Sequence, residues 1–259
     1  QIIVVDNASS DGTVDFLKNH DLNLEIIENT HNLGFGRAMN KGIKEAKSYY
    51  TLLLASDMVL EPDCLMSFLK YIKREENIGL LGGYLYDYYN KKLFFSGHKV
   101  KLSWNFKQYE INGDGNIEFT DLIPGAFVFS KTALLKQFRG FDERYFCYFE
   151  DLDLTLRFKE AGFRNLIIPE AKAYHLGGGQ GIKKHAADKK IQFELVKNVL
   201  IIYFKHAKLF WLVLFFIRYM LLGFIKNIFG ANQRSITLKT RWWAICNLID
   251  LIKARYCGR

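Results

Sequence analysis

Short apolar runs alternate with segments of helical periodicity over the first 75 residues of the chain. This pattern predicts strands at 2–5, 24–28 and 50–55, and helices at 13–19, 36–47 and 61–74. Strands that alternate with helices are typical of an α/β fold with a mostly parallel sheet. Ligands of such sheets bind beyond the carboxyl ends of the strands, where polar clusters follow Val5 and Ala55.

The alternation changes in the second half of the chain. Tyr84 to Phe119 has the pattern of short β-like pieces, and a helix is predicted over 151–161, ended by Gly162. Residues from about 188 to the end have helical spacing. We therefore expect two regions, an α/β domain over 1–187 and a helical region over 188–259.

The net charge of the chain changes near the same boundary. Residues 1–179 hold 21 Lys and Arg against 24 Asp and Glu, a net charge of −3, whereas residues 180–259 hold 15 against 3, a net charge of +12. This asymmetry predicts an anionic partner for the C-terminal region only. The basic residues are interleaved with Leu, Ile, Phe and Trp, which favours an anionic membrane surface over nucleic acid.

The apolar segment from Leu209 to Ile225 contains Arg218 near its middle, and a second basic and aromatic segment runs from Arg241 to Arg255. Seventeen residues are barely enough to cross a bilayer, and a central arginine is costly there. Interfacial helices on the cytoplasmic face of the cell membrane are the favoured interpretation. A single span, a helical core extension and a dimer contact are the alternatives.

The four cysteines are far apart, so neither a zinc site nor a disulfide framework is expected, and a reducing cytoplasm is the simpler environment. The chain starts with Gln1, and the first predicted strand begins at once without a signal peptide. We therefore expect the natural N-terminus to lie upstream of Gln1.

Five acidic or imidazole residues at three places in the chain are candidates for chemistry. Asp57 follows a buried strand, where a carboxylate can hold a divalent cation or simply cap the strand. Glu150, Asp151 and Asp153 begin a predicted helix, either as a general base or as acids favoured at a helix N-terminus. His175 precedes a glycine run at 177–179 and is either a ligand or a structural residue.

A loop at the junction of a strand and a helix could meet phosphate. Asn32 to Ala38 offers backbone amides and Arg37 at this place. The loop has no Walker-type Lys-Ser/Thr and no G-x-G-x-x-G pattern, so nucleotide binding through those motifs is not supported.

Taken in order, these segments resemble family 2 glycosyltransferases, and the rhamnosyltransferase-like branch most of all. The resemblance covers about residues 1–180 and rests on Val4–Thr13, Asn32–Asn40, Leu53–Asp57, Gly125–Ala126, Gly140–Phe146, Glu150–Asp153 and His175. It implies a GT-A fold, in which a mixed sheet is flanked by helices. The family's first strand, which is central in that sheet, is not found in this chain, and a strand and helix of roughly 30 residues would supply it.

The resemblance also implies roles for the matching residues. A nucleotide-diphosphate sugar donor is expected to contact Asp6, Asn7, Asn32, Gly34, Arg37 and Ser56. Asp57 and His175 would hold Mg²⁺ or Mn²⁺, and Asp151 would be the catalytic base with Glu150 beside it. Asp57, Asp151 and His175 are therefore expected to converge around one cleft. One departure is Ala55, because the family usually has Asn or Asp two residues before the metal-binding acid.

The implied reaction is an inverting displacement that moves the sugar to a hydroxyl of a glycan or lipid-linked glycan, as in the assembly of cell-surface polysaccharide. One rival interpretation is a non-catalytic membrane-docking module with a degenerate sugar-nucleotide fold. A sugar-phosphate nucleotidyltransferase would need a Gly-rich loop with Arg and Lys after its first strand, a region not found here. A nucleic-acid binder is disfavoured because the basic region shows no recognition module.

Overall fold

The computed structural model describes residues 1–74, 76–177, 188–222 and 234–257. Its strands are β1 (Ile2–Asp6), β2 (Leu24–Glu28), β3 (Tyr50–Leu54), β4 (Met58–Leu60), β5 (Ile78–Asp87), β6 (Leu93–Phe95), β7 (His98–Leu102), β8 (Phe106–Glu110), β9 (Glu118–Phe119), β10 (Phe127–Lys131) and β11 (Arg164–His175). Its helices are α1 (Thr13–Lys18), α2 (Phe35–Glu45), α3 (Cys64–Ile72), α4 (Thr132–Gln137), α5 (Glu150–Glu160), α7 (Lys189–His206), α8 (Leu209–Leu222), α10 (Arg234–Cys246) and α11 (Leu248–Cys257).

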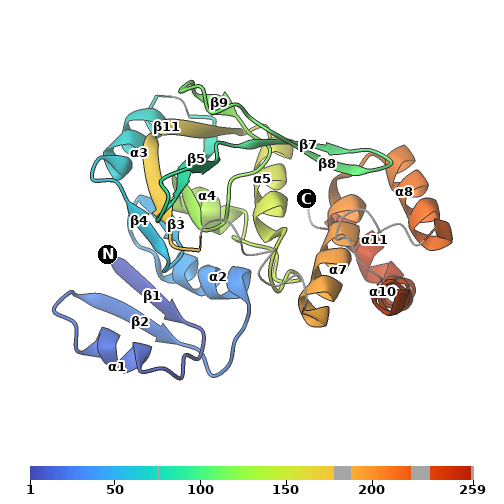
Figure 1. The fold of residues 1–259 in the computed structure, drawn as a ribbon, viewed down its shortest axis with the longest axis horizontal. Coiled ribbons are helices and arrows are strands. Elements are labelled where there is room, and N and C mark those ends of the chain that lie inside the picture. The colour runs from blue at the N-terminus through green and yellow to red at the C-terminus, as the bar shows by residue number, and fades with distance from the viewer. Residues whose placement is uncertain (75, 178–187, 223–233, 258–259) are drawn as a thin grey trace.

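The main sheet has seven strands, with the order β3-β10-β5-β11-β4 and with β6 and β9 paired to β5 and β11. β5 and β11 run parallel, whereas β10 is antiparallel to both β3 and β5, and β4 is antiparallel to β11. A separate parallel pair, β1 and β2, carries α1 and lies beside α2 at the N-terminal end of the molecule (Figure 1). The mixed sheet expected from the resemblance is confirmed, and the mostly parallel sheet expected from the alternation pattern is wrong.

The difference has a simple physical origin. β4 follows β3 after a turn of three residues, and β10 is reached through the extended segment that follows β9, without a helical crossover. β3 and β4 nevertheless lie at opposite edges of the sheet and pair with β10 and β11, which come much later in the chain, and both of these edge pairs are antiparallel. β5 and β11 run parallel and are joined by a long connection that includes α5, so the sheet is mixed.

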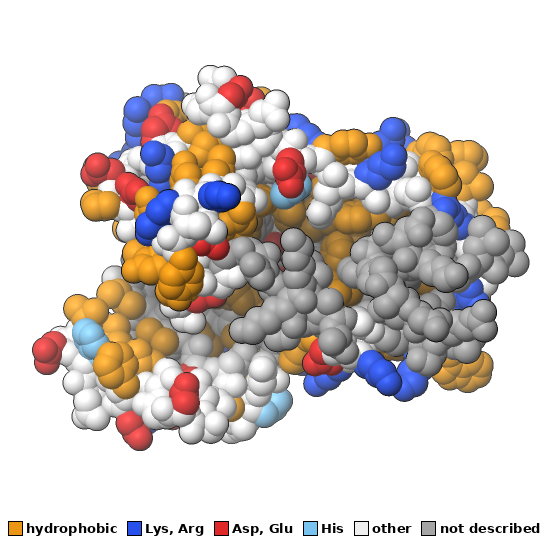
Figure 2. All heavy atoms as spheres, in the orientation of Figure 1, with side chains coloured by type: hydrophobic (Ala, Val, Ile, Leu, Met, Phe, Trp, Pro, Cys, Tyr) orange, Lys and Arg blue, Asp and Glu red, His pale blue; other side chains and the backbone are white. Residues whose placement is uncertain are grey.

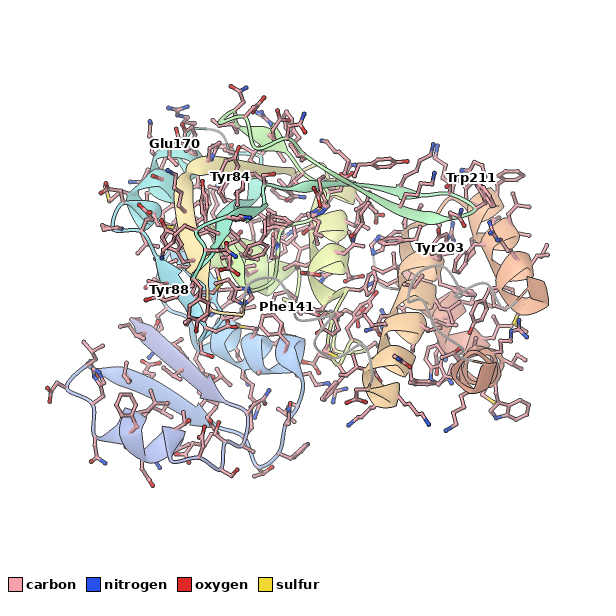
Figure 3. All side chains as sticks on the ribbon, in the orientation of Figure 1. Tyr84, Tyr88, Phe141, Glu170, Tyr203 and Trp211 are labelled. Carbon is pink, nitrogen blue, oxygen red and sulfur yellow. The ribbon has the colours of Figure 1, made fainter. Side chains whose placement is uncertain are left out.

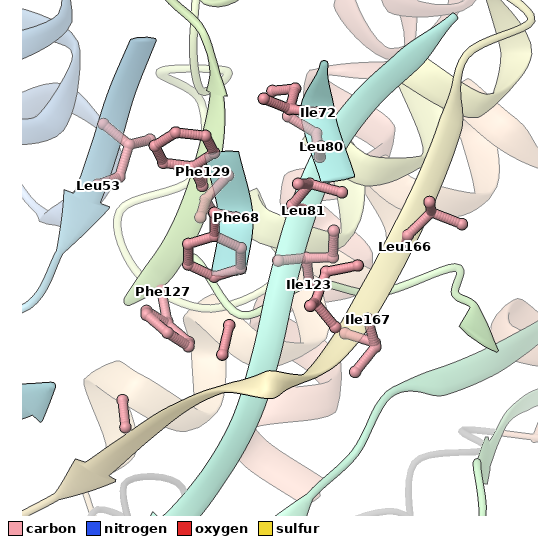
Figure 4. Close-up of a cluster of buried hydrophobic side chains, with 14 of the residues drawn as sticks. Leu53, Phe68, Ile72, Leu80, Leu81, Ile123, Phe127, Phe129, Leu166 and Ile167 are labelled. Carbon is pink, nitrogen blue, oxygen red and sulfur yellow. The ribbon is translucent and has the colours of Figure 1, made fainter. Parts of the chain in front are cut away.

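The centre of the sheet is apolar on both faces. The first eight residues of β5 are buried, as the run Ile-Gly-Leu-Leu-Gly-Gly-Tyr-Leu requires of a strand covered from both sides. On one face Phe68 of α3 stacks on Phe129 at a centroid distance of 5.1 Å and lies against Phe127 at 5.3 Å (Figure 4). This cluster fixes the strand ends that carry the candidate site.

Helix α5 is buried on two sides. Leu154 and Phe158 belong to the cluster that packs on the sheet, whereas Leu152 and Leu156 belong to a second cluster built mainly from α7, α8, α10 and α11. In Figure 1, α5 accordingly lies between the sheet and the C-terminal helices. The predicted domain boundary at residue 187 lies outside the described residues, and the second cluster joins side chains from both predicted regions.

The apolar segment predicted at 209–225 begins with a helix, α8. α8 has 14 described residues, and part of the predicted segment, residues 223–225, lies outside the described ones. Among the helices that the structure describes, none combines the length and the apolarity that crossing a membrane requires. The β7–β8 hairpin reaches this region, where Asn105 accepts a hydrogen bond from Arg218 at 3.0 Å (Figure 1).

Candidate active site

The pairing of β4 with β11 brings Asp57 and His175 together. His175, the last residue of β11, is opposite Met58, the first residue of β4, so Asp57 lies directly before the paired position. The backbone N–H of Leu176 donates to the Asp57 carbonyl at 2.9 Å and fixes the turn. Asp57 Oδ2 and His175 Nε2 are 2.8 Å apart.

This pair has the chemistry of a divalent metal site. A carboxylate oxygen and an imidazole nitrogen suit Mn²⁺ and related ions, and the Asp57 side chain is 46% exposed, so its second oxygen is accessible. A Cβ atom at Gly177 would lie 3.2 Å from His175 Nε2 and 3.3 Å from Asp57 Oδ2, which means that this glycine keeps the space over both donors open. Among the described residues no third His, Cys, Asp or Glu completes a cluster with this pair.

The second acidic group lies at the start of α5, beside the segment that leads into β10. Asp151 accepts hydrogen bonds from the backbone N–H groups of Gly125 at 3.3 Å and Leu152 at 2.8 Å. Gly125 precedes Ala126, whose carbonyl accepts a hydrogen bond from the Ala55 N–H at 3.0 Å. Asp151 is therefore linked through two short backbone steps to the turn that carries Asp57.

Burial alters the acidity of both helix-start acids. Burial is the largest cause that raises the pKa of Asp151, although two backbone N–H groups bind its carboxylate. Burial, and then the neighbouring charge of Asp151, raises the pKa of Glu150 to about 8. Glu150 Oε2 is buried and has no hydrogen-bond partner among the described residues. Asp151 is the half-buried member of this pair and retains contact with the surface.

Asp6 and Asn7 lie at the carboxyl end of β1. The Asp6 carboxylate accepts a hydrogen bond from the Ser9 N–H at 3.0 Å, and hydrogen bonds from Ser9 lower its pKa. Asn7 donates to the Gly34 carbonyl at 3.2 Å and accepts from the Leu33 N–H at 3.2 Å. The Asn7 side chain thus ties the first polar turn to the loop at 32–34.

The remaining predicted donor contacts lie around that loop. Asn32 accepts a hydrogen bond from the Gly34 N–H at 2.9 Å, and Gly34 has a φ of +88°, a conformation that favours glycine. Arg37 donates from Nε to the Glu143 carbonyl at 3.1 Å. Ser56 is exposed in the turn before Asp57. Arg37 therefore contacts the segment that follows α4, and the role of these four residues toward a donor stays a prediction.

The segment that follows α4 packs against α2 and completes the surroundings of the loop. Asn40 of α2 donates to the Phe141 carbonyl and accepts from the Phe141 N–H, both at 2.8 Å. Phe141 lies against Phe35 with ring centroids 5.7 Å apart, beside α2 (Figure 3). This contact fixes the Gly140–Phe146 segment that leads into α5.

Comparison with known proteins identifies the family. The sequence profile of Glycosyl transferase family 2 matches residues 1–138, more than half of the chain. The chain belongs to this family.

Two relatives of this family 2 chain are rhamnosyltransferases. The N-acetylglucosaminyl-diphospho-decaprenol L-rhamnosyltransferase of Mycobacterium tuberculosis is 23% identical over 201 residues, which are 67% of this chain and 66% of that protein. Rhamnosyltransferase WbbL of Escherichia coli is 24% identical over 168 residues, 55% of this chain and 60% of WbbL. The chain therefore spans slightly less than two thirds of the length of these relatives.

Solved structures place this family 2 chain in the GT-A fold. S. aureus TarS 1–349 in complex with UDP-GlcNAc superimposes with a TM-score of 0.57 at 17% identity, over 98% of this chain and 72% of TarS 1–349. The mannosyltransferase PcManGT from Pyrobaculum calidifontis, in complex with GDP-Man and Mn²⁺, gives a TM-score of 0.53 at 15% identity, over 100% of this chain and 64% of that one. At these identities the likeness establishes the fold.

The motifs did not single out several residues that organise the site. Asn29 is buried, donates to Asn7 at 3.0 Å and receives a hydrogen bond from Lys41. Asn198 of α7 is buried and binds the turn before α5. An amide within the apolar run of α7 is a signal that could have indicated such a role, because a buried amide requires partners.

Proposed function

We propose that this chain is the catalytic part of an inverting glycosyltransferase, which moves a sugar from a nucleotide-diphosphate sugar to a hydroxyl of a glycan or lipid-linked glycan. One observation carries the proposal: the Asp57–His175 pair, where β4 meets β11, and the Asp151 carboxylate, at the start of α5, are linked through the backbone of Ala55, Ala126 and Gly125. The family and the bound nucleotide sugars named for two GT-A neighbours support it.

In this mechanism Asp151 is the general base. The acceptor oxygen forms a bond to the anomeric carbon while the bond from that carbon to the diphosphate oxygen breaks, and the electron pair leaves with the nucleoside diphosphate. The acceptor proton passes to the Asp151 carboxylate, whose raised pKa makes it a better base than an exposed aspartate. The N–H groups of Gly125 and Leu152 hold this carboxylate in one orientation.

Asp57 and His175 would hold the divalent metal, Mg²⁺ or Mn²⁺. When bound, the ion supplies positive charge near the departing diphosphate. The open space above Gly177 and the exposure of Asp57 fit an ion that shares its remaining positions with phosphate oxygens. Asp6 and the loop at 32–37 are proposed to contact the nucleoside and phosphates, since they lie on the N-terminal lobe that leads into α2.

The C-terminal helices are proposed to rest on an anionic membrane surface at its cytoplasmic face. Large apolar side chains with exposed fractions from 47% to 70% cover them: Leu209, Phe210, Val213, Ile217, Trp242, Ile245 and Ile249. Orange side chains reach the surface along this edge of the molecule, with blue Lys and Arg nearby (Figure 2). An apolar cavity of about 350 Å³ opens between α7, α8 and α11. Such a surface suits an acceptor that carries a lipid.

The test is sugar transfer by the purified protein with UDP-, GDP- and dTDP-sugars, rhamnose donors first, in the presence of Mn²⁺ or Mg²⁺. Metal-dependent turnover of one donor is expected, falling about 10²–10⁴-fold in Asp151→Asn. Asp57→Ala should weaken metal-dependent donor binding at least about tenfold. Asp63→Asn, at the start of α3, is the control and should match the wild type.

Donor binding without turnover, unchanged in Asp57→Ala and Asp151→Asn, would instead favour the non-catalytic docking module. Turnover that survives removal of the metal and persists in Asp57→Ala would refute the metal role of the Asp57–His175 pair while leaving the transferase activity in place.

A further inference from the structure

The turn that precedes Glu150 and Asp151 has an unusual backbone. Tyr148 and Phe149 have φ angles of +66° and +70°, so two consecutive residues that are not glycine adopt the left-handed conformation. A side chain disfavours this conformation, and such pairs persist only where the surroundings impose them. The question is which contacts impose this turn.

Four consecutive carbonyl groups in the turn are bound, and from different sides. The Phe146 carbonyl accepts from the Phe35 N–H at 3.1 Å, on the side of the loop at 32–34. The carbonyls of Cys147 and Tyr148 both accept from Asn198 Nδ2, at 2.8 and 2.9 Å. The Phe149 carbonyl accepts from the Asp153 N–H at 3.0 Å, as the first turn of α5. Asn198 therefore supplies both contacts at the point where the left-handed stretch begins.

The Asn198 side chain is buried at its contact with the Cys147 and Tyr148 carbonyls. It has no exposed surface, and its Oδ1 is buried without a hydrogen-bond partner among the described residues. A buried carbonyl oxygen without a partner destabilises a protein, so only the two N–H bonds of this amide justify its place in an apolar helix. Asn198 acts on the turn as a donor alone.

A second contact between the same helices fixes the rotation of α5. Asp153, two residues after Asp151, is fully buried. It forms ion pairs with Lys205, with His206 Nε2 at 2.9 Å and with Arg157 Nε at 2.8 Å. Lys205 and His206 are at the end of α7. Helix α7 thus holds α5 both before and after the proposed base.

We propose that Asn198 is a positioning residue for the Glu150–Asp151 pair: by binding the Cys147 and Tyr148 carbonyls it sets the turn from which the base is presented. The inference rests on the proposed function. Without these donors the turn relaxes toward ordinary backbone angles, and Asp151 moves away from the Gly125 N–H. A displacement of the order of 1 Å costs a transferase about 10²-fold in rate.

The test compares Asn198→Leu and Asn198→Asp, which are close to asparagine in size and lack the N–H donors, with Ile202→Ala as a matched control. Ile202 is fully buried one turn further along the same helix, so its truncation removes packing but no hydrogen-bond donor. Both Asn198 variants should lose kcat by about ten- to a hundredfold, with the donor KM within about twofold of the wild type. Ile202→Ala should lower the unfolding temperature and keep kcat.

Hydrogen exchange measured by mass spectrometry gives a readout that needs no activity. Exchange in the peptide 147–153 should rise in the Asn198 variants and stay unchanged in Ile202→Ala. If Asn198→Leu does not fold, Asn198→Ser is used, because its hydroxyl keeps one donor and its kcat should be intermediate. A wild-type kcat in a folded Asn198 variant, or unchanged exchange in the turn, would overturn the proposal while the transferase activity stands. A wild type that turns over no donor would refute the proposed function itself, and the positioning role with it.

Discussion

Glu150 and Asp151 are adjacent in sequence and experience different surroundings. Asp151 is bound by two backbone N–H groups, whereas Glu150 Oε2 is buried with no partner in the described part of the chain. A carboxylate in such a place is costly, and the group keeps its proton instead. Two adjacent acids thus differ in their surroundings, because Asp151 has hydrogen-bond donors and Glu150 is held by burial beside the charge of its neighbour.

The buried proton of Glu150 makes stability depend on pH. Its pKa is about 8 in the folded protein against an ordinary value of 4.5, so between these pH values the unfolded chain binds fewer protons than the folded one. The free energy of unfolding therefore falls as pH rises across this window. Glu150→Gln removes the titration, and the wild type should lose at least about 1 kcal/mol more than the variant between pH 5 and pH 8.

Urea unfolding at a series of pH values measures this difference. Glu76→Gln, at an exposed position, is the control and should follow the wild type. Parallel curves for Glu150→Gln and the wild type would show that Glu150 is ionised in the folded protein at neutral pH.

At the scale of single elements, the loop at 32–34 depends on one glycine for two reasons. Gly34 has a φ of +88°, and a Cβ atom there would lie under 3.0 Å from the Phe146 carbonyl oxygen. Gly115 has nearly the same φ, +86°, but nothing within 4 Å of a Cβ atom. The two positions therefore separate backbone strain from steric conflict.

Gly34→Ala should cost about 1–3 kcal/mol more in the free energy of unfolding than Gly115→Ala. Both variants carry the strain of a positive φ, and only the first must push the turn before α5 aside. Chemical denaturation of the two variants measures the difference. Equal losses would mean that the loop at 32–34 moves freely from Phe146.

The contact between α5 and α7 allows a second comparison. Asp153→Asn leaves Lys205, His206 and Arg157 around a neutral side chain in the interior and should cost about 3–5 kcal/mol. Asp250→Asn removes a pair with Lys253 whose side chains are 72% and 68% exposed, and should cost at most about 0.5 kcal/mol. Thermal and urea unfolding check both values, and a small loss in Asp153→Asn would show that water reaches the cluster.

The same elements show what sequence patterns can predict. Helices at 13–19, 36–47 and 151–161 were predicted within two residues of α1, α2 and α5, because their apolar spacing and flanking residues are local properties. The first part of β5 was not predicted. Its continuous apolar run, interrupted by Gly79, Gly82 and Gly83, has no alternation by which to recognise a strand. The resemblance indicated Asp57 and His175 correctly as neighbours, but the Asn198 contact joins residues about 50 positions apart and depends on how α7 packs.

At the scale of the whole molecule, an N-terminal lobe, a mixed sheet and a basic helical region follow one another, with α5 between the last two (Figure 1). Of the 15 basic residues after position 180, 13 lie in the helical region over 188–259, which also carries the exposed apolar side chains of α8, α10 and α11. The proposed contact with an anionic membrane surface rests on this combination of positive charge and exposed apolar side chains.

Binding to vesicles tests that face. The protein should co-sediment with vesicles that contain anionic lipid, and binding should weaken as salt is added. Replacing Trp242 and Ile249, which are 69% and 70% exposed, by glutamate should reduce binding at least about tenfold. Met66→Glu, on α3 and 65% exposed, is the matched control. Equal binding by all three proteins would exclude this surface as the docking face.

The contacts between α7 and α5 limit how far the helical region and the sheet region can be exchanged independently. If the helical region binds the acceptor's surface and the sheet region carries the chemistry, the two regions would be exchangeable between related enzymes only when they fold independently. Here α7, the first helix of the helical region, also donates hydrogen bonds to the Cys147 and Tyr148 carbonyls and places Lys205 beside Asp153. A chimaera joined before α7 would therefore change two properties at once: the surface that binds the acceptor, and the contacts that position Asp151. Acceptor specificity and catalytic rate would change together.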